Sequence, residues 1–128
     1  MDKEAYERGM ALRRKVMGEQ HVAKRGASRD RYTKQQNELV TALAWGTIWS
    51  RPGLPLKVRS LVTLGMLTAL NRPDELKGHI VGALNNGATP DEIIEVFVHS
   101  AGYCGFPASN GAVRLCVEVL KEEGLLKE

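Results

Sequence analysis

Apolar residues recur three and four positions apart along most of the chain, and no segment alternates apolar with polar residues. Spacing of this kind places apolar side chains on one face of an α-helix, whereas a half-buried strand repeats every two residues. We therefore predict an all-α protein of about six helices joined by short loops. Its 128 residues are a common size for one domain, so we expect a single domain over residues 1–128.

Periodicity, glycine and proline together set the expected helix bounds in the first two thirds of the chain. The segment after Gly18, residues 19–31, is polar and is interpreted as a connecting arm that can include one helical turn. The segment 56–70 is apolar almost all round, which predicts a helix buried on most sides. The expected helices span 2–17, 33–49, 56–70 and 74–86.

The start of the next helix has the most specific local signal. Thr89 is a capping residue, Pro90 occupies the first helical position, and Glu92 stands where a capping box needs it. This helix ends near Gly102 and Gly105, and a final helix begins at Pro107. Several helices are broadly apolar, yet a chain this small has little interior, so we expect a homo-oligomer.

Composition excludes several classes of protein. The chain is 43% apolar and 26% charged with a net charge of +3, which is typical of a globular rather than a disordered protein. The longest apolar stretch, residues 61–70, is too short to cross a membrane, and the N-terminus lacks the apolar core of a secretory signal. We therefore expect a cytoplasmic protein with no membrane partner, in which Cys104 and Cys116 are free thiols.

Positive charge is concentrated at the N-terminus. Residues 1–35 contain ten Lys/Arg against five Asp/Glu, whereas the remainder contains eight against ten. Acids alternate with the bases in this region, and no aromatic residues are interleaved for base stacking. The distribution therefore disfavours a nucleic-acid partner.

Few residues are available for chemistry. The sequence lacks the paired-cysteine, zinc-helix, phosphate-loop and nucleophile-elbow motifs. His79 lies four residues after Glu75 on a predicted helix, so the two side chains can share a face. A carboxylate there would favour a protonated imidazole, although a simple helix-surface pair explains the same spacing.

The other candidates each have a plain structural interpretation. His21 lies on the polar arm, and His99 lies among apolar residues where a structural histidine is at least as plausible as a catalytic one. Arg51 and Arg59 flank the start of the apolar helix and can hold a carboxylate, or simply occupy a solvated helix end.

Five stretches of sequence together resemble the 4-carboxymuconolactone decarboxylase family. The most specific are the RPGL turn within residues 44–54, the GALNNG run within 79–97 and the YCGFPASN turn within 103–112; residues 7–22 and 59–70 also agree. The resemblance covers about residues 7–120. It implies an all-helical fold like that of the alkylhydroperoxidase-D proteins, assembled as a homo-oligomer, typically a trimer or hexamer.

The resemblance implies a cofactor-independent lyase that needs no metal. Such an enzyme converts 4-carboxymuconolactone to the 3-oxoadipate enol-lactone and carbon dioxide in the β-ketoadipate pathway of aromatic catabolism. Loss of carbon dioxide requires groups that stabilise the developing charge and an acid that protonates carbon. The expected catalytic residues are His79, Glu75 and His21, and the expected substrate-binding residues are Arg51, Arg59, Trp45, Trp49 and Phe106.

Two departures from related patterns bear on the activity. Thr47 stands where the decarboxylases have an acidic residue, so the sequence does not decide which substrate is used. Aligned by His79, the positions of the peroxidase-like relatives' two cysteines hold Arg72 and Glu75, and Ser60 replaces their upstream glutamate. The alternatives are a thiol peroxidase or disulfide reductase using Cys104 and Cys116, and a non-catalytic binding protein of the same fold.

Overall fold

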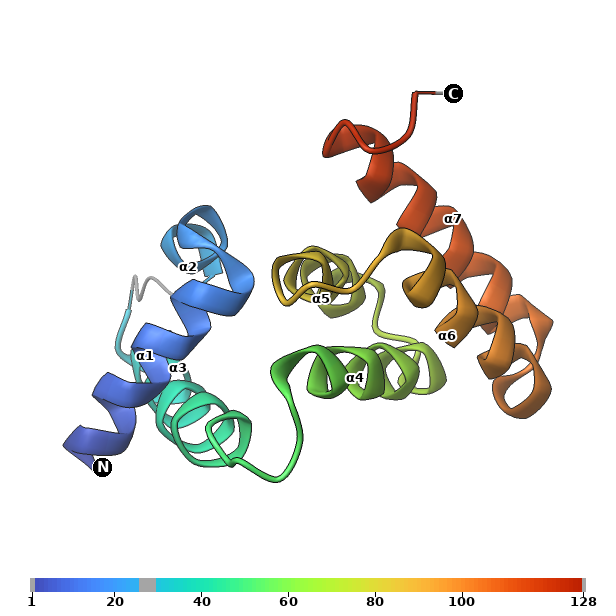
Figure 1. Ribbon diagram of the computed structural model, residues 1–128. Helices are drawn as coiled ribbons and strands as arrows, with labels where there is room; N and C mark the ends of the chain where they lie inside the picture. The colour runs from blue at the N-terminus through green and yellow to red at the C-terminus, as the bar shows by residue number, and fades with distance from the viewer. Residues whose placement is uncertain (1, 26–29, 128) are drawn as a thin grey trace. The chain divides into compact units, whose positions relative to one another are not determined.

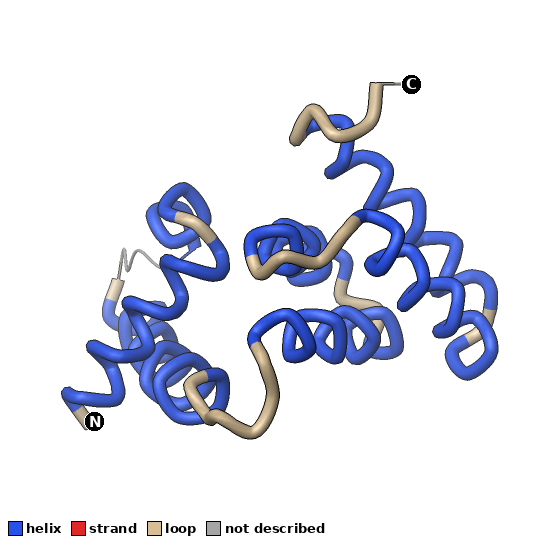
Figure 2. Tube along the Cα trace, in the orientation of Figure 1, coloured by secondary structure: helices blue, strands red, loops and turns tan. Residues whose placement is uncertain are grey.

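The computed structural model describes residues 2–25 and 30–127, and every regular element in these residues is helical (Figure 2). Seven α-helices and one π-helical segment account for the elements of the described chain, which confirms the all-α prediction and adds one helix to it. The chain divides into two compact units, Met1–Leu56 and Lys57–Glu128, and each is described by itself. The single domain over 1–128 stays a prediction.

The first unit is built on helix α1, which packs against the π-helical segment η1. Asp2 caps α1 by accepting from the amide of Ala5 at 3.1 Å, and Gly18 ends it at φ 91°, a conformation that glycine adopts without strain. α3 also packs against η1. The elements are α1 (Lys3–Met17), α2 (Glu19–Arg25), α3 (Arg31–Leu39) and η1 (Val40–Trp49). Figure 1 labels the three α-helices.

Two glycines let α1 and η1 approach to backbone contact. A Cβ atom added to Gly9 would lie 2.0 Å from the carbonyl oxygen of Thr41, and one added to Gly46 would lie 1.9 Å from that of Ala5. Neither position has room for a side chain. The glycines therefore fix how closely these two helices pack.

Two expectations for this unit are corrected. Residues 19–25 of the expected polar arm form helix α2, because Val22 is buried and anchors it, while Gly26 and Ser28 of that arm lie outside the described residues. The helix expected over 33–49 begins at Arg31 and becomes a π-helix from Val40. In the wider turn the hydroxyl of Thr47 donates to the carbonyl of Ala42, five residues back, at 2.9 Å.

The core of the first unit mixes aromatic, aliphatic and charged groups. Trp45 and Trp49 stack with ring centroids 4.7 Å apart and pack with Val16 and Met17. The guanidinium of Arg13 is buried in the same unit, where it donates to Asn37 Oδ1 at 2.7 Å and Thr41 Oγ1 at 3.1 Å. Both partners are neutral, and burial lowers the pKa of Arg13.

The second unit has an aliphatic core and well-capped helices. Thr89 Oγ1 accepts from the amide of Glu92 at 3.1 Å, and Glu92 Oε1 accepts from the amide of Thr89 at 2.9 Å, which confirms the predicted capping box. α7 packs against α5 and α6 (Figure 1). The elements are α4 (Leu56–Leu70), α5 (Pro73–Asn85), α6 (Pro90–Cys104) and α7 (Phe106–Glu122). The fully buried side chains include Leu64, Ile80, Ile93 and Phe97.

The prediction that the 56–70 helix is buried on most sides is wrong for the single chain. Only Ser60, Leu64 and Thr68 of α4 are buried, and they form one stripe. Another stripe, Val58, Val62, Met66 and Leu70, is exposed, with Met66 at 60% and Leu70 at 66%. The sequence predicts that these side chains are covered, but they are exposed on the second unit as the structure describes it. In the described parts of the chain, no helix is both long and apolar enough to span a bilayer.

Candidate active site

The sequence-predicted site residues are divided between the two units. The first unit contains His21, Trp45, Trp49 and Arg51, and the second contains Arg59, Glu75, His79 and Phe106. Each group is described within its own unit. The convergence of the two groups on one site stays a prediction.

His79 lies in the middle of α5 and is half-buried, in keeping with a group that can meet both a ligand and the protein interior. Glu75 lies one turn earlier on α5 and is exposed. The orienting role of Glu75 toward His79 stays a prediction.

Arg59 is held near α5 by a contact of its neighbour. Asn86, which follows the C-terminal end of α5, donates from Nδ2 to Oγ of the buried Ser60 at 2.9 Å. This bond sets the start of α4 beside the end of α5. His79 precedes Asn86 by about two helical turns, or roughly 10 Å along the axis. The convergence of Arg59 with His79 stays a prediction.

Trp49 and Arg51 line a groove of about 540 Å³ in the first unit. Its walls are one face of α1 and the segment 49–56, and its floor is largely apolar. Trp45 does not line this groove; it is buried behind Trp49 and stacks on it. Thr47 contributes its hydroxyl to the π-helical turn, so the residue that replaces the expected acid has a structural role here.

His21 lies on α2 and is half-buried. Burial, together with the charges of Arg13 and Arg25, lowers the pKa of His21 below its usual 6.5. The ring is therefore mostly neutral near pH 7, which suits a proton acceptor better than a donor. His99 is exposed, so it is not a core residue, and its ring centroid lies 5.3 Å from that of Tyr103. It lines a pocket with Glu92, Glu95 and Ser100.

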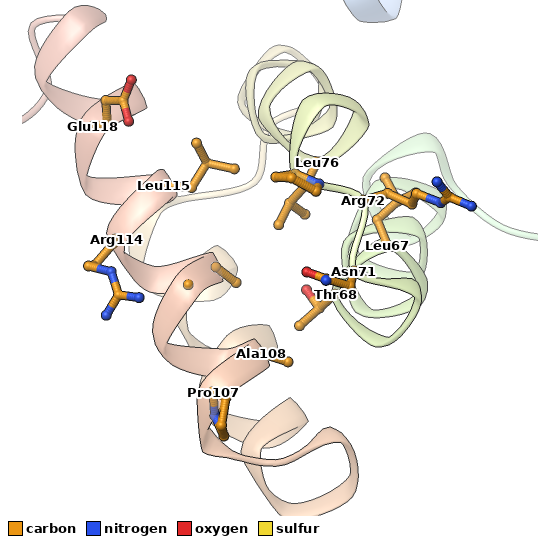
Figure 3. Close-up of a pocket in the computed structure, with 13 residues that line it drawn as sticks. Leu67, Thr68, Asn71, Arg72, Leu76, Pro107, Ala108, Arg114, Leu115 and Glu118 are labelled. Atoms are coloured by element: carbon orange, nitrogen blue, oxygen red, sulfur yellow. The ribbon is translucent and has the colours of Figure 1, made fainter.

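The second unit contains a cavity that the sequence did not predict. It measures about 450 Å³ and lies among α4, α5 and α7 (Figure 3). Thr68, Asn71 and Leu115 point into it, whereas Arg72 points away (Figure 3). Asn71 has a positive φ of 55°, which places its side chain at the turn after α4. None of the predicted site residues lines this cavity, and Phe106 is 67% exposed.

The thiols do not form a dithiol site. Cys104 and Cys116 are both free, as predicted, and Cys116 is fully buried. Burial raises the pKa of the Cys116 thiol to about 11, so its nucleophilic thiolate is scarce near neutral pH. In the described residues no three His, Cys, Asp or Glu side chains gather as a metal site would require.

The model of the carboxymuconolactone decarboxylase family matches residues 37–118, which include parts of both units. The chain therefore belongs to the carboxymuconolactone decarboxylase family, as the sequence motifs predicted. It is a carboxy-lyase of that family.

Two named relatives agree with this assignment. The chain is 41% identical over 127 residues to a 4-carboxymuconolactone decarboxylase of Acinetobacter baylyi, covering 99% of this chain and 95% of that protein. It is 39% identical over 115 residues to a nitrosuccinic acid decarboxylase of Metarhizium robertsii, covering 90% of this chain and 76% of that protein.

Proposed function

We propose that this protein decarboxylates 4-carboxymuconolactone, or a closely related carboxylated lactone, to the 3-oxoadipate enol-lactone and carbon dioxide. The observation that carries the proposal is the 41% identity to a 4-carboxymuconolactone decarboxylase over almost the full length of both chains. The proposed setting is aromatic catabolism in the cytoplasm.

The proposed reaction needs an electron sink and an acid. The bond between the ring carbon and the carboxylate breaks, carbon dioxide leaves, and the electron pair delocalises into the conjugated lactone. A proton then adds to carbon to give the enol-lactone. Because the substrate accepts the electrons itself, the protein has to supply charge stabilisation and the proton.

The proposed roles follow from the side chains available. His79 delivers the proton, because it is half-buried and held in the middle of a well-formed helix. Arg51 and Arg59 hold carboxylate groups or the developing enolate. Trp49, backed by Trp45, provides an apolar wall beside the departing carboxylate, where poor solvation favours neutral carbon dioxide over the anion.

The second relative gives a rival substrate within the same reaction type. Nitrosuccinic acid, named for that protein, is a small dicarboxylic acid whose nitro group can accept electrons as a conjugated lactone does. Thr47 replaces the acidic residue expected at this position, and it lies between Trp45 and Trp49 in the sequence. Because of this difference, nitrosuccinate is kept as a candidate substrate. Both substrates share two carboxylates on a short carbon frame.

Replacing His79 tests the proposed acid. The purified protein is incubated with 4-carboxymuconolactone and, in parallel, with nitrosuccinate, and substrate loss and carbon dioxide release are followed. We expect turnover of the lactone, and a loss of about 100-fold or more in kcat for His79→Ala, since positioned acids typically contribute this much. The exposed His99→Ala is the matched control and should keep full activity.

The outcomes separate substrate from residue. Turnover of nitrosuccinate alone would replace the lactone as substrate. Full activity of His79→Ala would remove His79 from the mechanism even if the lactone reacts. No turnover of either compound would contradict the proposed function and favour a binding protein. The thiol-peroxidase alternative has less support, because Cys116 is buried and its pKa is raised.

We also propose that the working enzyme is a homo-oligomer, such as a trimer or hexamer. The support is the exposed stripe on α4, in which Val58, Val62, Met66 and Leu70 follow one another at four-residue spacing. Light scattering coupled to size exclusion should give a mass several times 14.1 kDa. Met66→Glu should shift the protein toward the monomer, whereas Lys121→Glu, on an exposed part of α7, should not. A monomeric wild type would overturn this proposal.

A further inference from the structure

The groove of the first unit has one wall made by a single face of α1. Arg8, Ala11, Leu12 and Lys15 follow one another at spacings of three, one and three residues, so they share that face. The facing wall is the segment from Trp49 to Leu56, which includes Arg51. The groove, which we call the α1 groove, thus lies wholly within the first unit.

Charge in the α1 groove is of one sign. Its lining contains Arg8, Lys15 and Arg51 and no acidic residue, and the remaining lining is mostly apolar. Arg14, one residue away on α1, faces elsewhere and lies 3.7 Å from Glu19. Among the described residues, neither Arg8 nor Lys15 forms an ion pair. Both cations are therefore available to an anionic ligand.

The two cations of α1 are held apart at the ends of an apolar strip. Arg8 is fixed by its Nε, which donates to the carbonyl of Gly46 at 2.8 Å, so part of its guanidinium remains to meet a ligand. Lys15 lies seven residues further along, about 10 Å by helical rise. Ala11 and Leu12 occupy the face between them. A ligand that matches this pattern has an apolar middle and a negative group at each end.

We propose that the α1 groove binds a small organic dicarboxylate, with Arg8 and Lys15 each engaging one carboxylate and Arg51 facing them from the other wall. The volume of about 540 Å³ is in the range of small-ligand sites. The inference rests on the proposed function, because Arg51 and Trp49 belong to both. It adds Arg8 and Lys15 as determinants that select a second carboxylate.

A pair of probe compounds tests the requirement for two carboxylates. trans,trans-Muconate is a stable six-carbon dicarboxylate, and sorbate has the same conjugated skeleton with a methyl group in place of one carboxylate. Binding of each to the full-length protein is measured by calorimetry, with tryptophan fluorescence as a second readout because Trp49 lines the groove. We expect muconate to bind about ten-fold more tightly than sorbate.

Matched substitutions on α1 locate the site. Lys15→Ala should weaken muconate binding about five-fold and leave sorbate binding little changed, and Lys15→Glu should weaken it further. Arg14→Ala removes the same charge from the same helix outside the groove and should not alter binding. Lys15 is exposed, so its replacement should not disturb folding.

Failure of this inference is distinguishable from failure of the proposed function. His79→Ala should bind muconate as the wild type does while losing turnover. Equal effects of Lys15→Ala and Arg14→Ala would overturn the α1 groove and leave the lactone reaction standing. Equal affinity for muconate and sorbate would also overturn it. Muconate binding that depends on Lys15, in a protein that turns over no lactone, would support the groove and contradict the reaction.

Discussion

The two units of this protein hold their helices together in different ways. In Met1–Leu56, two glycines bring backbones into contact and a buried arginine bonds to neutral partners. In Lys57–Glu128, aliphatic side chains pack around Phe97, and α6 begins with a capping box. Stability in the second unit is spread over many side chains, whereas in the first it depends on a few atoms. Single substitutions should therefore act unequally on the two.

Adding one methyl group to a glycine in each unit gives the largest expected contrast. Gly46→Ala places Cβ 1.9 Å from the carbonyl oxygen of Ala5, so α1 must move, and we expect a loss of about 4 kcal/mol or more in the free energy of unfolding. Gly65→Ala, in α4, meets nothing closer than Val96 Cγ1 at 3.8 Å and should stabilise by about 0.5 to 1 kcal/mol. Urea denaturation measures both. Equal effects would remove the contrast.

Removing the buried arginine has the next largest expected effect. Arg13→Ala leaves Asn37 Oδ1 and Thr41 Oγ1 without this donor and opens a cavity, so we expect a loss of about 2 to 3 kcal/mol. Arg14→Ala, one residue further along α1 and exposed, should change stability by no more than about 0.5 kcal/mol. If Arg13→Ala were as mild as Arg14→Ala, the buried hydrogen bonds would not stabilise the first unit.

The same contrast explains which parts of the fold could be predicted. The bounds of α5, α6 and α7 follow from proline, glycine and capping residues, whose effects are local and are encoded within one turn. α2 and η1 were missed because they depend on burial of Val22 and on a close approach of α1, which no short window of sequence contains. Gly9 and Gly46 were the available signals, since a glycine within a helix can mark a close approach of two backbones.

The candidate site residues follow from residue type and motif position, and their arrangement into one site stays a prediction. Histidine, arginine and tryptophan at motif positions pointed to His79, Arg51 and Trp49, because these residue types carry the required chemistry. Arg8 and Lys15 were not singled out, since on a helix with many charges only the fold shows which ones face a groove. Phe106 is 67% exposed at the start of α7, and its role as a wall of the site stays a prediction.

The smallest expected effect is a pH dependence that belongs to the first unit. The pKa of His21 is lower in the folded protein than its usual 6.5, because the ring is half-buried and lies near Arg13 and Arg25. The unfolded chain therefore binds more protons than the folded one as pH falls below about 6.5. Stability from this group is fully present above that pH. It declines below it until the folded ring also titrates.

His21→Gln should remove this component, so the variant should lose less stability than the wild type between about pH 7 and pH 5. Arg25→Gln should reduce it only in part, because burial is the larger cause of the lowered pKa. Thermal denaturation over this pH range measures the difference. The pKa values of Asp30 and Glu92 are lowered below their usual 3.8 and 4.5. These two carboxylates therefore change stability mainly at more acidic pH than His21 does. Identical pH profiles for the wild type and His21→Gln would mean that the histidine is as well solvated in the folded unit as in the unfolded chain.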